Sequence, residues 1–130
     1  MGQIVLPLMP KEKPMNVSMN MQQCMDDCYR CMAMCMETMM HCVGKGASCM
    51  TPQMMGMMQD CMDMCQMAMR CMMRSSGMTG KACAMCAEMC MASAAMCERM
   101  PEDEMMMRCA AVCHRCASAC SDMAKAMMAA

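Results

Sequence analysis

Cysteines between residues 24 and 35 are spaced so that their thiols share one face of a helix. The stretch reads C-x3-C-x2-C-x3-C, and Cys42 follows one heptad after Cys35. Because an α-helix makes a turn every 3.6 residues, steps of three and four residues return to the same face. Thiolates on such a stripe are ligands for soft metal ions. The pattern therefore indicates metal chemistry along the inner side of a helix.

Similar stripes recur in three later segments, and the last of them repeats the spacing of the first. Cys71 lies to one side of its stripe, and Cys49 falls between segments with no role assigned. The predicted thiol ligands are Cys24, Cys28, Cys31, Cys35, Cys42, Cys61, Cys65, Cys71, Cys83, Cys86, Cys90, Cys97, Cys109, Cys113, Cys116 and Cys120.

Four amphipathic helices must position these thiols. Thr51 and Pro52 mark a helix start, Pro101 is predicted to open the last helix, and Gly44 is predicted to help end the first. Residues 1–17 read as a short N-terminal arm. We expect an all-α fold, an antiparallel four-helix bundle over residues 18–128 whose stripes face one central tube. The helices are predicted at about residues 18–43, 52–74, 81–98 and 101–128.

Sulfur also dominates the rest of the apolar composition. The chain has 34 methionines and 17 cysteines among 130 residues, and it has no Phe or Trp. Met54 and Met106 stand on the stripes, so we predict that they are weaker thioether ligands at the tube ends that aid entry or exchange of metal. His41, near the end of the first helix, is a candidate ligand at the tube mouth, whereas His114 lies outward of its stripe.

Thiols and thioethers together favour Cu(I), and by extension silver, over zinc. A structural zinc site needs four ligands and does not use thioethers. Isolated buried charges are very costly, so thiolates in an apolar tube need counter-ions. About one monovalent ion per thiolate would bring the tube close to neutrality. The sequence therefore predicts that many Cu(I) ions are bound and stored inside the bundle.

Other interpretations fit the residues less well. Seventeen cysteines cannot all pair within one chain, and simple core packing does not explain why Leu and Phe are so rare. A sink for toxic copper, silver or cadmium uses the same ligands and stays open. A thiol redox protein is a weaker alternative, since it needs one exposed reactive pair. We predict no enzyme, because no catalytic constellation is evident, and adjacent Cys113 and His114 point about 100° apart on a helix.

Charge and hydropathy limit the partners. The net charge of -1 argues against nucleic acid, which requires a basic patch. No run of about 18 apolar residues is present to span a membrane. The chain as written carries no recognisable targeting segment, so we expect a cytoplasmic protein, with an exported mature form as the open alternative.

The cysteine spacing over roughly residues 20–125 resembles that of the bacterial copper storage proteins. The resemblance implies a cysteine-lined four-helix bundle that holds many Cu(I) ions, with the cysteines of its stripes as ligands. It also implies a homotetramer, and copper donor or acceptor proteins are further possible partners. Met54, Ser93 and Met106 occupy positions where this family is expected to carry cysteine. The chain thus looks like a methionine-rich member.

Overall fold

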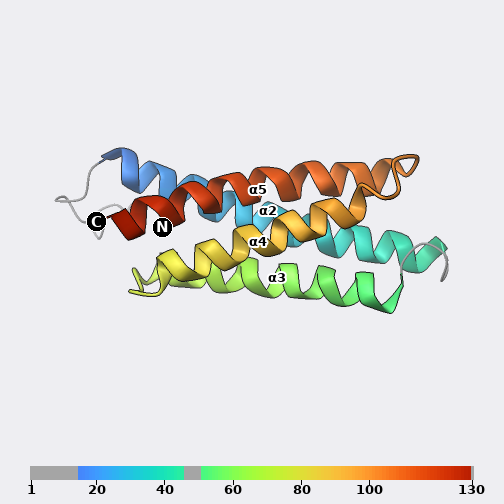
Figure 1. The fold of residues 1–130 in the computed structure, drawn as a ribbon, viewed down its shortest axis with the longest axis horizontal. Coiled ribbons are helices and arrows are strands. Elements are labelled where there is room, and N and C mark those ends of the chain that lie inside the picture. Colours follow the sequence, from blue (N-terminus) through green and yellow to red (C-terminus); the bar gives the residue numbers. More distant parts are fainter. Residues whose placement is uncertain (1–14, 46–50, 130) are drawn as a thin grey trace, which may run out of the picture.

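The computed structural model describes residues 15–45 and 51–129, and all regular structure in these ranges is helical. Most of the predicted arm (1–17), as well as Cys49, lies outside the described residues. With the labels of Figure 1, the helices are α2 (Met15–Lys45), α3 (Pro52–Met73), α4 (Thr79–Cys97) and α5 (Glu104–Ala129).

The helices form an up-and-down bundle in which each packs on two neighbours. Consecutive helices lie side by side and run in opposite directions (Figure 1), and α5 returns to pack against α2. The helices α2 and α5 also run in opposite directions, since Cys24 near the start of α2 contacts Cys120 late in α5, while Cys42 near the end of α2 contacts Met106 at the start of α5. The predicted all-α four-helix bundle is confirmed.

Local sequence explains where α3 begins. The Thr51 side chain accepts a hydrogen bond from the backbone N–H of Met54 at 3.1 Å, and Pro52 occupies the first helical position. Proline costs nothing there because its missing N–H would have no helical partner. The predicted start at residue 52 agrees with this N-cap.

One other predicted boundary was wrong. Pro101 does not open α5, because Asp103 accepts a hydrogen bond from the backbone N–H of Met106 at 3.2 Å and caps a helix that begins at Glu104. The helix α2 extends to Lys45, close to its predicted end at about residue 43, and so includes Gly44. A single glycine costs a helix only about 1 kcal/mol, too little to stop one that is packed in a bundle.

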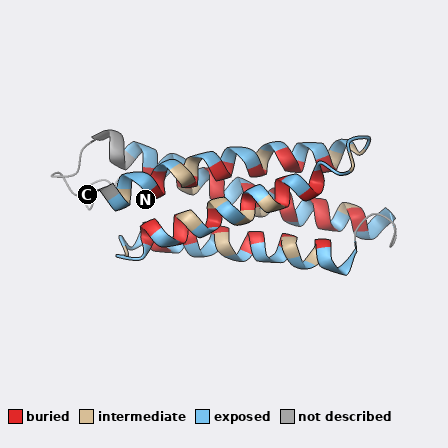
Figure 2. Ribbon diagram, viewed as in Figure 1, coloured by how far each residue is buried: buried red, intermediate tan, exposed pale blue. Residues whose placement is uncertain are grey.

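The core is a stripe of buried residues on each helix, and Figure 2 shows these stripes facing inward. On α2 the buried positions recur every three or four residues from Met21 to Cys42. Buried apolar side chains in the described residues are Cys, Met and Ala only. Thiols are small, so the helices can approach closely around them.

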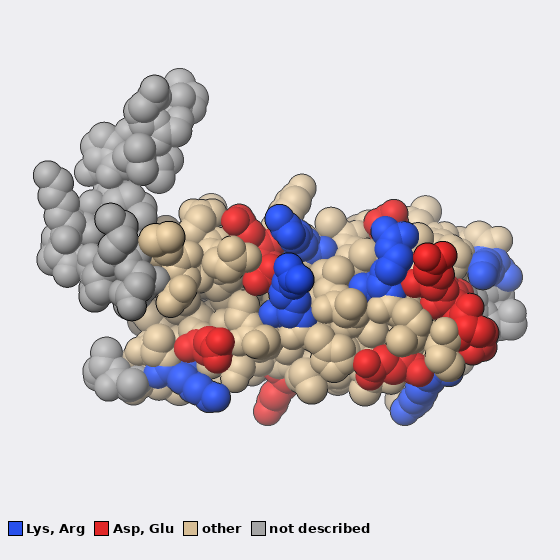
Figure 3. Space-filling view, turned by 90° about the horizontal axis from the view of Figure 1, so that it is seen from above, with Lys and Arg blue, Asp and Glu red and all other residues tan. Residues whose placement is uncertain are grey.

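The outer surface carries both signs of charge. Figure 3 shows acidic and basic side chains interspersed over one face, between neutral areas. Within the described ranges, no helix combines the length and the apolar character needed to cross a membrane.

Asp103 joins the end of α2 to the start of α5, and its loss should lower stability. Partial burial alone would raise its pKa, but the Met106 N–H, His41 and Lys45 together lower the pKa below the usual 3.8. The ionised form therefore stabilises the fold at pH values above the usual pKa of 3.8. This contribution disappears as the pH falls through the lowered pKa of the folded state.

We expect Asp103→Ala to lower the free energy of unfolding by about 1 kcal/mol at neutral pH. Asp103→Asn keeps a capping oxygen and should lose less stability. In acid, where Asp103 is protonated, the variant and the native chain should have the same free energy of unfolding. Urea denaturation of the metal-free protein at pH 7 and pH 3 measures both. Equal losses for the two variants would show that the cap is not what stabilises this end.

Candidate metal centre

Thiols from all four helices meet along the axis of the bundle. None of the sixteen described cysteines forms a disulfide, and none is more than 3% exposed. The Sγ atoms of Cys28 and Cys120 lie 3.5 Å apart, and those of Cys65 and Cys86 lie 3.7 Å apart. These contacts connect neighbouring helices, so the predicted stripes do face one another.

Thiols also touch across the diagonals of the bundle. Cys31 on α2 lies 3.8 Å from Cys90 on α4, and Cys65 on α3 lies 4.0 Å from Cys116 on α5, measured between Sγ atoms. A diagonal contact leaves no space for another side chain at the centre. The thiols therefore form one narrow tube of sulfur, which we call the sulfur tube.

Twelve of these cysteines fall into overlapping groups whose sulfur atoms all lie within 4.8 Å of one another. With metal–sulfur bonds of about 2.3 Å, as thiolates make to zinc, sulfurs around one ion lie about 3.8–4.0 Å apart. The groups thus fit metal ions with little movement. They are Cys24, Cys83 and Cys120; Cys28, Cys86, Cys116 and Cys120; Cys65, Cys86, Cys90 and Cys116; Cys31, Cys61, Cys65 and Cys90; and Cys31, Cys35, Cys61 and Cys113.

Without metal, contacts with neighbouring thiols and burial raise the pKa of some cysteines in the sulfur tube. The contact with Cys120, followed by Cys24 and then burial, raises the pKa of Cys83. The contact with Cys109 and then burial raise the pKa of Cys97. These thiols stay protonated until a cation replaces the proton.

In the middle, hydrogen bonding selects particular sulfurs for the negative charge. Interactions with Cys113 and then Cys116 lower the pKa of Cys31, because these thiols stabilise its ionised form. The pKa of Cys35 moves the opposite way, since its contacts with Cys109 and then Cys113 raise it. A few thiolates can form next to protonated neighbours, whereas ionising all of them requires cations in the tube.

Beyond this middle section, toward the α4–α5 turn, the thiol lining becomes incomplete. Met58 on α3 and Ser93 on α4 replace thiols there, with Ser93 Oγ 3.9 Å from Met58 Sδ and accepting a hydrogen bond from Cys113 Sγ at 3.7 Å. Cys97 and Cys109 are buried in the core but belong to none of the close groups of the described residues.

The thioethers predicted as ligands lie at this same end. Met54 is 9% exposed in the first turn of α3, and Met106 is fully buried in the first turn of α5, with its Sδ 3.7 Å from the Cys42 thiol. The starts of both helices are at one end of the bundle (Figure 1). This end therefore offers thioether and thiol donors together.

Met58 is a candidate ligand that the sequence analysis missed. It is fully buried, and Met54, Met58, Cys61 and Cys65 repeat the 4, 3, 4 spacing of the first thiol stripe. The spacing was therefore sufficient to find it, but only if methionine is counted equally with cysteine along the stripe.

Three residues named from the sequence lie apart from the sulfur tube. Cys71 is buried but in no thiol group, and its Sγ lies 4.0 Å from Arg74 Nη2. His41 contacts the Asp103 carboxylate at 3.2 Å, and His114 lies 2.9 Å from a carboxylate oxygen of Glu98 on the surface. The structure therefore directs both histidines toward carboxylates.

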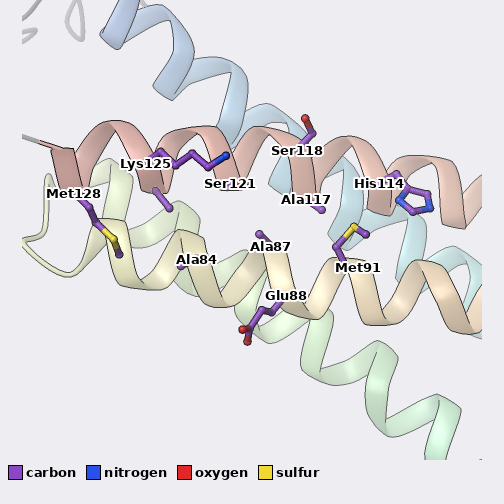
Figure 4. A pocket seen from close by; sticks show the side chains of 11 residues that line it. Ala84, Ala87, Glu88, Met91, His114, Ala117, Ser118, Ser121, Lys125 and Met128 are labelled. Carbon is purple, nitrogen blue, oxygen red and sulfur yellow. The ribbon is translucent and has the colours of Figure 1, made fainter.

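A surface hollow on the outside of the bundle is also separate from the thiols. It occupies about 810 Å³ between α4 and α5, where Figure 4 shows small side chains such as Ala84, Ala87 and Ala117 between Met91 and Met128. No cysteine lines it. It is thus a surface groove, whereas the metal-binding chemistry lies inside the bundle.

Comparisons with known proteins agree with this arrangement. The family model described as copper storage protein matches residues 17–125. A solved protein of Nitrosospira multiformis is 32% identical, with a TM-score of 0.77, and the match covers 84% of this chain and 98% of that one. The Cu(I)-bound copper storage protein BsCsp3 is 26% identical, with a TM-score of 0.76 and coverage of 81% and 98%. None of the curated proteins matches significantly.

The geometry predicts different effects for two buried cysteines on α3. Cys65→Ser removes a sulfur shared by two close groups, so we expect fewer bound Cu(I) ions. Cys71→Ser is the matched control, since that thiol is equally buried but outside the groups. Metal content after loading and gel filtration measures both. A similar loss for the two variants would contradict the assignment of the sulfur tube.

Proposed function

The chain belongs to the copper storage protein family, and from this premise we propose that its sulfur tube binds and stores many Cu(I) ions. One observation carries the proposal: the close thiol groups overlap from helix to helix instead of forming a single isolated site. Overlapping ligands suit a cluster of many ions, in which each thiolate serves more than one metal. Copper is thus the cargo of the protein.

Charge favours a monovalent ion in this tube. Each Cu(I) that replaces a thiol proton leaves the net charge of the interior unchanged, whereas a Zn²⁺ held by four thiolates leaves a site with two negative charges. Burial penalises that residual charge. Soft sulfur donors also match Cu(I) in bonding preference. Loading then releases protons, so uptake should weaken as the pH falls.

The same arrangement argues for a store and against a thiol redox protein. Redox cysteines are accessible and have a low pKa, but every described cysteine is buried. A storage role requires no turnover, and we propose none. A detoxification role for copper, silver or cadmium would use the same sulfurs. Titration with each of the three ions shows whether the protein prefers copper or binds all three soft metals equally well.

We also propose that copies of the chain assemble into a homo-oligomer, as the resemblance implies, and exchange copper with donor or acceptor proteins. Light scattering of the metal-free protein measures the assembly.

Titration of the reduced, metal-free protein with Cu(I) under nitrogen tests the storage proposal. A competing chelator of known affinity reports both the number of ions and how tightly they bind. We expect a count approaching or exceeding the number of cysteines, because the groups share ligands. Matched titrations with Ag(I), Cd²⁺ and Zn²⁺ show the metal preference.

A limit of one to four ions would contradict a store and indicate a discrete structural or redox site. A preference for zinc would contradict the assignment of copper as cargo. Either result would leave the fold and the family membership unchanged.

We predict that Met54 and Met106 speed the exchange of copper at their end of the tube. A double variant, Met54→Leu with Met106→Leu, keeps the volume but removes two neutral donors, and such substitutions usually cost the fold little. If the two thioethers together lower the barrier by about 1 kcal/mol, loading and release should slow about fivefold. Stopped-flow transfer to and from a chelator measures both rates.

Met21→Leu with Met123→Leu is the matched control, because these buried thioethers lie toward the opposite end of α2 and α5. We expect little change in that variant. Unchanged loading and release in the Met54 and Met106 variant would exclude an exchange role for them, without affecting the ion count on which the storage proposal depends.

A further inference from the structure

Ten methionines on the outside of the bundle are explained neither by the core nor by the sulfur tube. Each is between 37% and 72% exposed, whereas every described cysteine is at most 3% exposed. They are Met19, Met36, Met40, Met67, Met73, Met78, Met85, Met91, Met107 and Met128.

Packing gives no reason for methionine at these positions. Alanine, glutamate and lysine have helix propensities similar to that of methionine or better. Charged residues would also keep the surface soluble. If the surface merely tolerated apolar residues, several types would be present. Among the exposed large apolar residues that the structure describes, only Tyr29 and Val43 are not methionine. The thioether itself is therefore the common property.

Their distribution does not suit a single docking face or surface metal site. They lie on α2, α3, α4 and α5 and in the turn between α3 and α4. A docking surface gathers its apolar side chains in one contiguous patch, and a thioether metal site needs several sulfurs around one point. A layer distributed around a thiol core instead suits a reaction with a small molecule that arrives from any direction.

We propose that the exposed methionines consume electrophilic oxidants, with hypochlorous acid as the representative class, before these reach the sulfur tube. The thioether sulfur attacks the chlorine of hypochlorous acid, and hydroxide leaves. Water then attacks the chlorosulfonium sulfur and displaces chloride, and the hydroxide takes up one of the two protons released: R–S–CH₃ + HOCl gives R–S(O)–CH₃ + H⁺ + Cl⁻. Sulfur loses two electrons, and the chlorine of hypochlorous acid gains them as chloride.

Location makes this oxidation harmless on the surface and damaging inside. A sulfoxide is polar, so at an exposed position it faces water, whereas at buried Met58 or Met106 it would disrupt packing. Oxidation of the thiols to disulfide or sulfenic acid removes the metal ligands. The outer thioethers thus protect the groups on which metal binding depends.

The reduced, metal-free protein tests this inference independently of copper. One variant replaces all ten methionines by Gln (Met19→Gln and likewise at the other nine), which keeps side-chain length and helix-forming tendency. Both proteins are titrated with hypochlorous acid, remaining thiols are counted after denaturation, and sulfoxides are located by peptide mass spectrometry.

We expect the oxidant needed to destroy half of the thiols to fall about threefold in the variant, since ten thioethers no longer react first. In the native chain, sulfoxides should appear at the exposed positions while the thiols persist. Two variants with five substitutions each, one on α2 and α3 and the other in the rest of the chain, should show intermediate shifts and serve if the full variant folds poorly.

The control replaces three buried thioethers, Met21→Leu, Met72→Leu and Met123→Leu, and should leave the dose unchanged. Two results would overturn the inference: equal thiol loss in the native chain and the ten-position variant, or thiol oxidation in the native chain ahead of sulfoxide formation at the exposed methionines.

Discussion

Many thiolates together in the dry centre of this bundle require cations beside them, and most features of the molecule follow from that constraint. The thiols are buried, and their sulfurs are 3.5–4.0 Å apart where they touch. At such distances several thiolates together would repel strongly in a medium of low dielectric constant. The metal-free tube must therefore be largely protonated, and metal uptake exchanges protons for ions of the same charge.

The same constraint links cargo to stability. A core of Cys, Met and Ala lacks the branched and aromatic side chains that specify tight packing, so in the metal-free state it relies on many weak contacts. Ions that bind sulfurs from different helices, such as Cys31, Cys61 and Cys90, join those helices directly. Because the ligands come together only in the folded chain, each bound ion also stabilises the fold.

Periodicity made the helices and the thiol tube predictable, because steps of three and four residues fix which side chains share a face. It failed where one local contact decided the outcome. Asp103 caps α5 in place of the proline-led start, and Cys71 sits one position off its stripe and so leaves the tube. His41 turned toward Asp103, a partner 62 residues away that periodicity within one helix has no means to reveal.

The change of donor along the tube completes the electrostatic argument. In the middle, all four helices contribute thiols, including Cys31, Cys61 and Cys90, so negative charge can be shared among many bound ions. Toward the α4–α5 turn the lining passes to Met58, Ser93 and Met106, whose neutral atoms bind or pack without needing a counter-ion. Substituting methionine for cysteine at that end lowers the charge that must be neutralised there while sulfur remains continuous from Cys113 through Cys109 to Cys97.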